Sequence, residues 1–114
     1  MLTDLKYLQQ MTGNDNEMMK EMIEMFLLQL AELRVEMDSL FESQSWFELS
    51  RLAHKIKSSA LVMGVAQMAD EMKELELLAK EGKDTEKYPD YIARFNDMIE
   101  TTKTEMRPFL DSCK

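Results

Sequence analysis

The sequence predicts an all-α fold, an antiparallel four-helix bundle with an additional short N-terminal helix, formed as one domain over residues 1–114. Three observations support this. Glycine and proline, which most often interrupt helices, number only three and two. Apolar residues recur at steps of three and four through four long segments, as on one face of a helix. At 45% hydrophobic and 32% charged residues, the composition suits a core with a hydrated surface.

The first segments predict a short helix followed by a long one. Thr3 is expected to cap a helix that runs to about Met11, with Gly13 at its C-terminal end. Asp15 or Asn14 then caps the long helix. Its apolar positions alternate by four and three, which is the pattern of a bundle seam: Met19, Ile23, Phe26, Leu30, Leu33, Met37 and Leu40.

Two further helices are expected around Gly64. The run Ser45-Trp46-Phe47-Glu48 resembles a capping box, in which Ser45 caps the helix and Glu48 reaches back. This third helix ends near Gly64, and the next extends from about Val65 to Ala79 and is closed by Gly82. Because the connection at Gly64 is short, the two helices should pack antiparallel.

The last helix is expected after a charged loop over residues 80–87. Pro89 suits its first turn. Pro108 predicts a kink or an end near Arg107, with Phe109 and Leu110 packing as a tail. Methionines at seven helical positions are expected to form a pliant core rather than an adaptable binding surface: Met18, Met22, Met37, Met63, Met68, Met72 and Met98.

Charge and composition exclude several function classes. A net charge of −8 argues against nucleic acid as a partner. No apolar run approaches the roughly 20 residues of a membrane span, and no signal-peptide pattern opens the chain, so a cytoplasmic protein is expected. The single cysteine, Cys113, permits no intrachain disulfide or cysteine metal cluster and is expected to be an exposed tail thiol. Loops for nucleotide phosphates are absent from the sequence.

The only histidine, His54, lies within the third predicted helix. On a helical wheel the apolar stripe of this helix includes Leu49, Leu52 and Ile56, and His54 lies about 140° from Leu49. The imidazole should therefore point towards water rather than into the core. This favours a functional residue over a structural core histidine, although a surface histidine without a role remains an alternative.

The neighbours of His54 suit phosphoryl chemistry. Lys57 at i+3 and Ser58 at i+4 share a helix face with the histidine. A neutral imidazole keeps a lone pair for attack, and a lysine beside it can offset the charge of an incoming phosphoryl group. The same helix carries Arg51, Lys55 and Lys57 against only Glu48, which suits an acidic docking partner.

The run His54-Lys55-Ile56-Lys57-Ser58-Ser59-Ala60, followed by Gly64, resembles the signature of histidine-containing phosphotransfer (HPt) domains. That signature is histidine, any residue, an aliphatic, lysine, small residues and then glycine; Ile56 stands where leucine is commoner. The resemblance continues into the next helix and also covers chain length and helix order. Its matching positions there are Met72, Leu75, Glu76 and Gly82.

The resemblance implies a phosphocarrier without kinase or ATPase activity of its own. His54 would accept a phosphoryl group on Nε2 from a receiver-domain aspartate and pass it to another receiver. Lys57 would stabilise the transferring charge, and Glu76 would hydrogen-bond the second ring nitrogen. From the residues alone, Glu76 at the apolar margin of its helix needs a partner or is simply solvated.

Further expectations concern the surroundings of the site. Ser58 and Ser59 would leave room for the phosphoryl group and donate hydrogen bonds, and Gly64 would end the helix. The docking patch would comprise Phe47, Arg51, Lys55 and Leu61. The expected partners are response-regulator receiver domains and a hybrid sensor histidine kinase. No metal or cofactor is expected on this chain, since the divalent metal would belong to the receiver.

Two alternatives stay open beside the carrier. One is a helical adaptor that docks receiver or kinase domains without being phosphorylated. The other is an oligomerising structural protein, whereas the carrier is expected to be a monomer.

Overall fold

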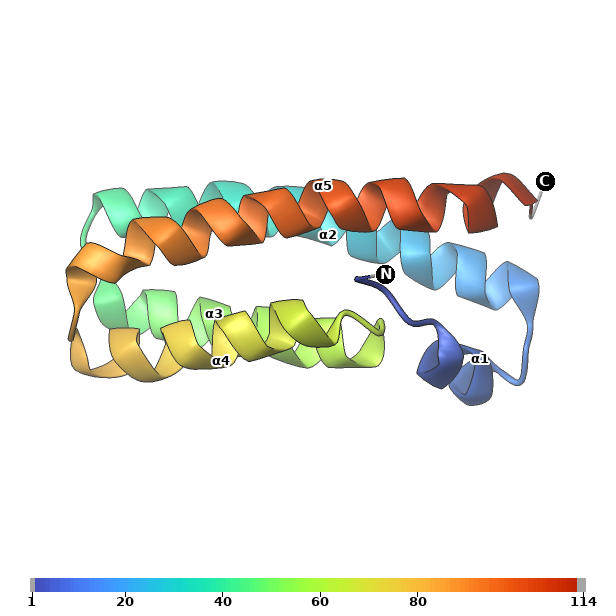
Figure 1. Cartoon of the computed structure of the whole chain (residues 1–114), viewed down its shortest axis with the longest axis horizontal. Coiled ribbons are helices and arrows are strands. Elements are labelled where there is room, and N and C mark those ends of the chain that lie inside the picture. Colours follow the sequence, from blue (N-terminus) through green and yellow to red (C-terminus); the bar gives the residue numbers. More distant parts are fainter. Residues whose placement is uncertain (1, 113–114) are drawn as a thin grey trace.

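The computed structural model describes residues 2–112 and has an all-α architecture. Within these residues it has five α-helices and one short 3-10 helix: α1 (Lys6–Thr12), α2 (Asn16–Glu42), α3 (Trp46–Val62), α4 (Ala66–Glu81), η1 (Thr85–Lys87) and α5 (Tyr88–Ser112). Helices α2 to α5 form an antiparallel four-helix bundle, α1 lies at one end of it, and the longest extent of the molecule is 44 Å (Figure 1). The predicted fold class is confirmed.

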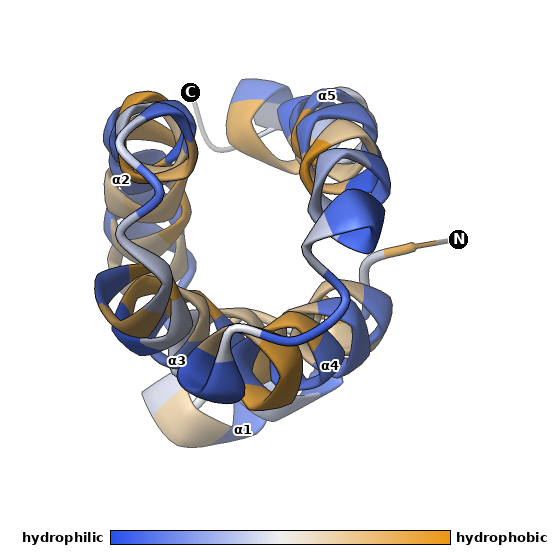
Figure 2. Cartoon of the chain, turned by 90° about the vertical axis from the view of Figure 1, so that its left-hand side faces the viewer, coloured by the Kyte–Doolittle hydropathy of each residue, from blue (hydrophilic) through white to orange (hydrophobic). Residues whose placement is uncertain are grey.

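The four long helices form a ring in the order α2, α3, α4, α5 (Figure 2). Each packs on its two neighbours, and the short Gly64 turn makes α3 and α4 an antiparallel pair. The predicted apolar stripes point into one shared core, in which Leu49, Ile56 and Leu75 are fully buried. Helix α3 contacts α2 and α4 with its two flanks and the core with its inner face, so its outer side is open to solvent.

Among the predicted N-terminal caps, only that of α2 is confirmed, whereas the predicted C-terminal glycines Gly13 and Gly82 do end α1 and α4. The carboxylate of Asp15 accepts a hydrogen bond from the backbone N–H of Met18 at 3.1 Å. The predicted cap by Thr3 is wrong, since α1 begins at Lys6 and the Thr3 hydroxyl donates to Glu105 Oε1 at 2.8 Å. The capping box is also wrong: Ser45 makes no capping hydrogen bond. Its hydroxyl lies 2.8 Å from that of Ser43.

At the other end of the chain, Pro108 does not end α5, which continues as a helix to Ser112. Of the two predicted alternatives, an end near Arg107 is therefore wrong, and a kink there stays a prediction. Phe109 and Leu110 are partly buried against the core, so their burial favours continuing the helix beyond the proline. The helix begins at Tyr88, so Pro89 lies in its first turn as predicted, and a 3-10 turn replaces part of the predicted loop.

Five of the seven methionines predicted for the core are buried there: Met37, Met63, Met68, Met72 and Met98. Met18 is 48% exposed, so its assignment to the core is wrong. Met22 is only partly buried. None of the helices in residues 2–112 is both long and apolar enough to cross a bilayer. Cys113 lies outside the described residues.

Candidate functional site

His54 is presented to solvent from the open side of α3. Its side chain is 58% exposed, whereas Leu52, Ala53 and Ile56 around it in sequence are buried. The buried residues anchor α3 to the core, and because they fix the rotation of the helix they also fix the direction in which the imidazole points.

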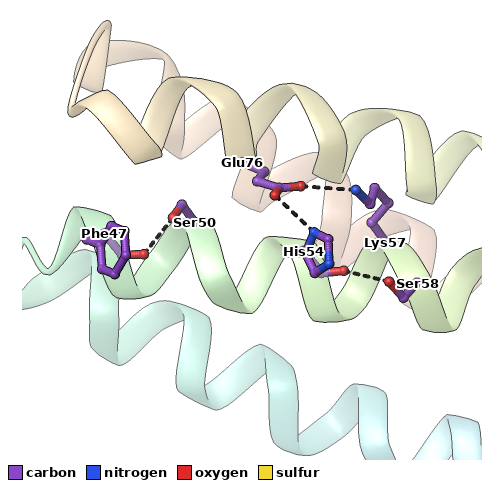
Figure 3. Close-up of polar contacts among 6 residues, drawn as sticks. All are labelled: Phe47, Ser50, His54, Lys57, Ser58 and Glu76. Carbon is purple, nitrogen blue, oxygen red and sulfur yellow. Dashed lines mark hydrogen bonds and ion pairs between the residues drawn. The ribbon is translucent and has the colours of Figure 1, made fainter.

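One ring nitrogen of His54 is held by the neighbouring helix. Nδ1 lies 3.0 Å from Oε2 of Glu76, which projects from α4 (Figure 3). The other carboxylate oxygen, Oε1, accepts a hydrogen bond from Nζ of Lys57 at 3.2 Å. Glu76 thus joins α4 to two positions on α3 that are one helical turn apart.

The charge state of Glu76 determines the tautomer of the ring. Burial raises the pKa of Glu76, but hydrogen bonds from Lys57 and His54 and the charges on these residues outweigh burial and hold the pKa below its usual value. Glu76 is therefore ionised at neutral pH, and an ionised carboxylate only accepts hydrogen bonds. Nδ1 must be the donor, so in the neutral ring the lone pair available for attack lies on Nε2.

The side chains of Lys57 and Glu76 are shielded to a similar degree, being 22% and 23% exposed. Partial burial strengthens their ion pair relative to a pair in open water. Lys57 therefore lies beside the histidine, as predicted, but its ammonium is engaged with Glu76.

The two predicted supporting serines lie on the α2 side of His54. Ser58 is exposed, and its hydroxyl donates to the backbone carbonyl of His54 at 3.2 Å. Ser59 is half-buried and lines a groove. Gly64 lies beyond the end of α3 with a φ of +78°, a conformation that side chains other than glycine rarely adopt.

The four residues predicted for docking are all exposed on α3. Phe47 and Leu61 are 60% and 56% exposed, and Arg51 and Lys55 are exposed between them in sequence. On the helical wheel Phe47, Arg51 and Leu61 lie on the same side as His54, so apolar and basic side chains surround the imidazole.

An apolar groove between α2 and α3 adds surface that the sequence did not predict. It has a volume of about 580 Å³, and its lining includes Met22, Met25, Leu28, Ser58, Ser59 and Val62. Met25 and Leu28 are 70% and 66% exposed. Periodicity identifies which residues face the core, but it does not distinguish a hydrated outer face from a binding surface. The one available sequence signal was that apolar residues extend beyond the core stripe of α2.

No metal-binding constellation accompanies the site, because residues 2–112 hold no group of three or more histidine, cysteine or acidic side chains able to ligate an ion. The arrangement offers a nucleophilic nitrogen, a carboxylate that orients it and a nearby ammonium.

The family model of the Hpt domain matches residues 21–105, a range that includes His54, Lys57 and Glu76. No curated protein and no solved structure matches the chain.

Proposed function

The chain belongs to the Hpt domain family, and we propose that it is a phosphorelay carrier that receives a phosphoryl group on His54 from one receiver domain and passes it to another. The family implies histidine phosphotransfer in two-component signalling, and Hpt domains are carriers rather than autonomous enzymes. The observation that carries the proposal is the exposed ring of His54, whose Nδ1 is occupied by Glu76 while Nε2 remains available.

In this proposal the chain's own residues position the ring and balance charge. Glu76 fixes the tautomer, and Lys57 offsets the charge on the incoming phosphoryl group. The small side chains of Ser58 and Ser59 leave space beside the ring. The divalent metal that phosphoryl transfer requires would be held by the receiver, and the compartment would be the cytoplasm.

The docking surface we propose for receivers combines the exposed face of α3 with the adjoining groove. Ser58 lines the groove and is one helical turn from His54, so a receiver whose aspartate reaches Nε2 must also cover part of it. Phe47 and Leu61 would add apolar contacts, and Arg51 and Lys55 would attract acidic side chains. A hybrid sensor kinase would dock through its receiver domain, and the carrier would act as a monomer.

The test is phosphoryl transfer from a labelled, phosphorylated receiver domain. The carrier predicts a label on the protein that is acid-labile and alkali-stable, and that is absent in His54→Gln, which removes the only histidine. Circular dichroism of the variant should show unchanged helicity, because the His54 side chain contributes little to the core. A wild-type protein that binds receivers but stays unlabelled would instead identify a docking adaptor.

A further inference from the structure

The two carboxylate oxygens of Glu76 contact two different partners. Oε2 contacts Nδ1 of His54 at 3.0 Å, and Oε1 contacts Nζ of Lys57 at 3.2 Å (Figure 3). While the site is empty, part of the negative charge that faces the ring is therefore neutralised by Lys57. While its ammonium is hydrogen-bonded to Glu76, Lys57 cannot at the same time make its full contact with a phosphoryl group on Nε2.

Both signs of charge occur on the helices that carry the site. The basic residues within about one turn of His54 or Glu76 along α3 and α4 are Arg51, Lys55, Lys57, Lys73 and Lys80; the nearest acidic residues along the same helices are Glu48 on α3 and Glu74 on α4, while Glu32 on α2 lines the groove that Ser58 borders. Glu76 is the only anionic side chain in hydrogen-bond contact with the ring among residues 2–112. The proton on Nδ1 therefore depends on this carboxylate more than on any other described group.

The chemistry of the proposed transfer makes that proton important. The Nε2 lone pair attacks the phosphorus, the N–P bond forms, and the bond from phosphorus to the receiver's aspartate oxygen breaks with its electron pair leaving on the carboxylate. The phosphorylated ring keeps its proton on Nδ1 and carries a positive charge. For onward transfer an aspartate oxygen of the next receiver bonds to the phosphorus while the N–P electron pair returns to Nε2, and the leaving group is neutral imidazole only if Nδ1 is still protonated. Without that proton it would be imidazolate, a much poorer leaving group.

Building on the proposed function, we propose that Lys57 moves from Glu76 to the phosphoryl oxygens when His54 is phosphorylated, which frees the whole Glu76 charge to hold the proton on Nδ1. Lysine suits this exchange, because its ammonium is a compact charge on a flexible stem. Glu76 is then a positioning residue that keeps the phosphohistidine ready for onward transfer, and Lys57 links this effect to the arrival of the phosphoryl group.

The test compares Glu76→Gln with Glu74→Gln after chemical phosphorylation by phosphoramidate. The glutamine carbonyl at position 76 can still accept the Nδ1 hydrogen bond, so the variant removes charge with little change in shape. Glu74 is on the same helix but accepts a hydrogen bond from Tyr91 on α5, which makes it a matched control. The readout is a ¹⁵N NMR titration that gives the pH at which Nδ1 of the phosphohistidine loses its proton.

We expect Glu76→Gln to lower this pH midpoint by about one unit, the usual scale for removing a close opposite charge, and Glu74→Gln to leave it unchanged. Transfer to a receiver should fall with rising pH in both proteins, and the fall should begin at a lower pH in Glu76→Gln, in step with its lower Nδ1 midpoint. An equal midpoint in Glu76→Gln and wild type would overturn the proposal.

A second variant tests the movement of Lys57. In the phosphorylated protein Lys57→Met should shift the midpoint equally in the wild-type and Glu76→Gln backgrounds, because the ammonium has already left Glu76. A larger shift when Glu76 is present would show that Lys57 stays on Glu76 and would overturn the exchange. Failure of the proposed function looks different, since it gives phosphohistidine with the expected midpoints but no transfer to any receiver.

Discussion

At the scale of single residues, Glu76 is the group on which the site's geometry depends. It accepts one hydrogen bond from each of two α3 side chains, and it can accept both bonds together only when the carboxylate is ionised. The favourable interactions of the charged form hold its pKa below the usual value of 4.5. A carboxyl group with a lowered folded-state pKa stabilises the fold above its unfolded pKa and loses this effect as the pH falls.

Glu76→Gln should therefore reduce the free energy of unfolding by about 1 kcal/mol at pH 7, the scale of one partly shielded ion pair. The difference from wild type should shrink as the pH falls below 4.5, because protonated Glu76 and glutamine then make similar hydrogen bonds. Urea unfolding at a series of pH values measures it. A difference that stays constant down to pH 3 would show that ionisation of Glu76 does not stabilise the fold.

The sequence predicted part of this site, because helical periodicity fixes direction. The buried stripe of α3 was sufficient to place His54 towards solvent. The sequence could not predict that His54 and Lys57 share a single carboxylate, since this depends on the spacing between α3 and α4 and on side-chain torsions. The groove was missed for a similar reason: the exposure of Met25 follows from how α2 and α3 are packed, not from its place in the periodic pattern.

At the scale of elements, the turn at Gly64 is tightly packed against the N-terminal segment. The N–H of Asp4 donates to the Gly64 carbonyl at 2.8 Å. A Cβ added at Gly64 would overlap the carbonyl oxygen of Asp4. Glu105 on α5 holds the preceding residues by accepting from the backbone N–H groups of Leu2 and Thr3. The turn therefore requires glycine both for its backbone conformation and for this close approach.

Gly64→Ala is expected to cost about 1–2 kcal/mol more than Gly13→Ala. Both positions have positive φ, +78° and +63°, but a Cβ at Gly13 meets nothing within 4 Å. Urea unfolding gives the free energies, and amide hydrogen exchange at Asp4 should become faster only in Gly64→Ala. Equal losses in the two variants would mean that the contact with Asp4 contributes nothing.

The helices themselves were predictable, whereas their ends were predictable only where local bonds decide them. Asp15 caps α2 as expected because its partner lies three residues away. Thr3 fails as a cap because its hydroxyl is bound to Glu105, which is 102 residues distant. Pro108 removes one backbone donor, but contacts of Phe109 and Leu110 with the core accompany a continued helix. In both cases long-range packing outweighs the local signal.

At the scale of the whole molecule, charge is distributed unevenly over the bundle. The chain has a net charge of −8, whereas α3 carries three basic residues against one acidic residue. Helices α3 and α5 lie diagonally across the ring of helices (Figure 2). A charge change on α3 therefore acts close to the site, whereas the same change on α5 alters the net charge of the molecule at a distance from the site. Long-range attraction chiefly affects association rates and weakens with salt.

Arg51→Glu should slow association with an acidic receiver about tenfold at low salt, and the effect should diminish at high salt. Arg107→Glu on α5 changes the net charge equally and should have a much smaller effect, since Arg107 is exposed on the helix diagonal to the site. Stopped-flow association at two ionic strengths gives both rates. If the two variants slow binding equally, net charge rather than the α3 face directs the encounter.

The most direct test of the central claim is to identify the modified nitrogen by long-range ¹H–¹⁵N NMR after phosphorylation through a receiver domain. The arrangement of His54 and Glu76 predicts a phosphoryl group on Nε2 of His54 and a retained proton on Nδ1. A phosphoryl group found on Nδ1, or on any residue other than His54, would contradict it.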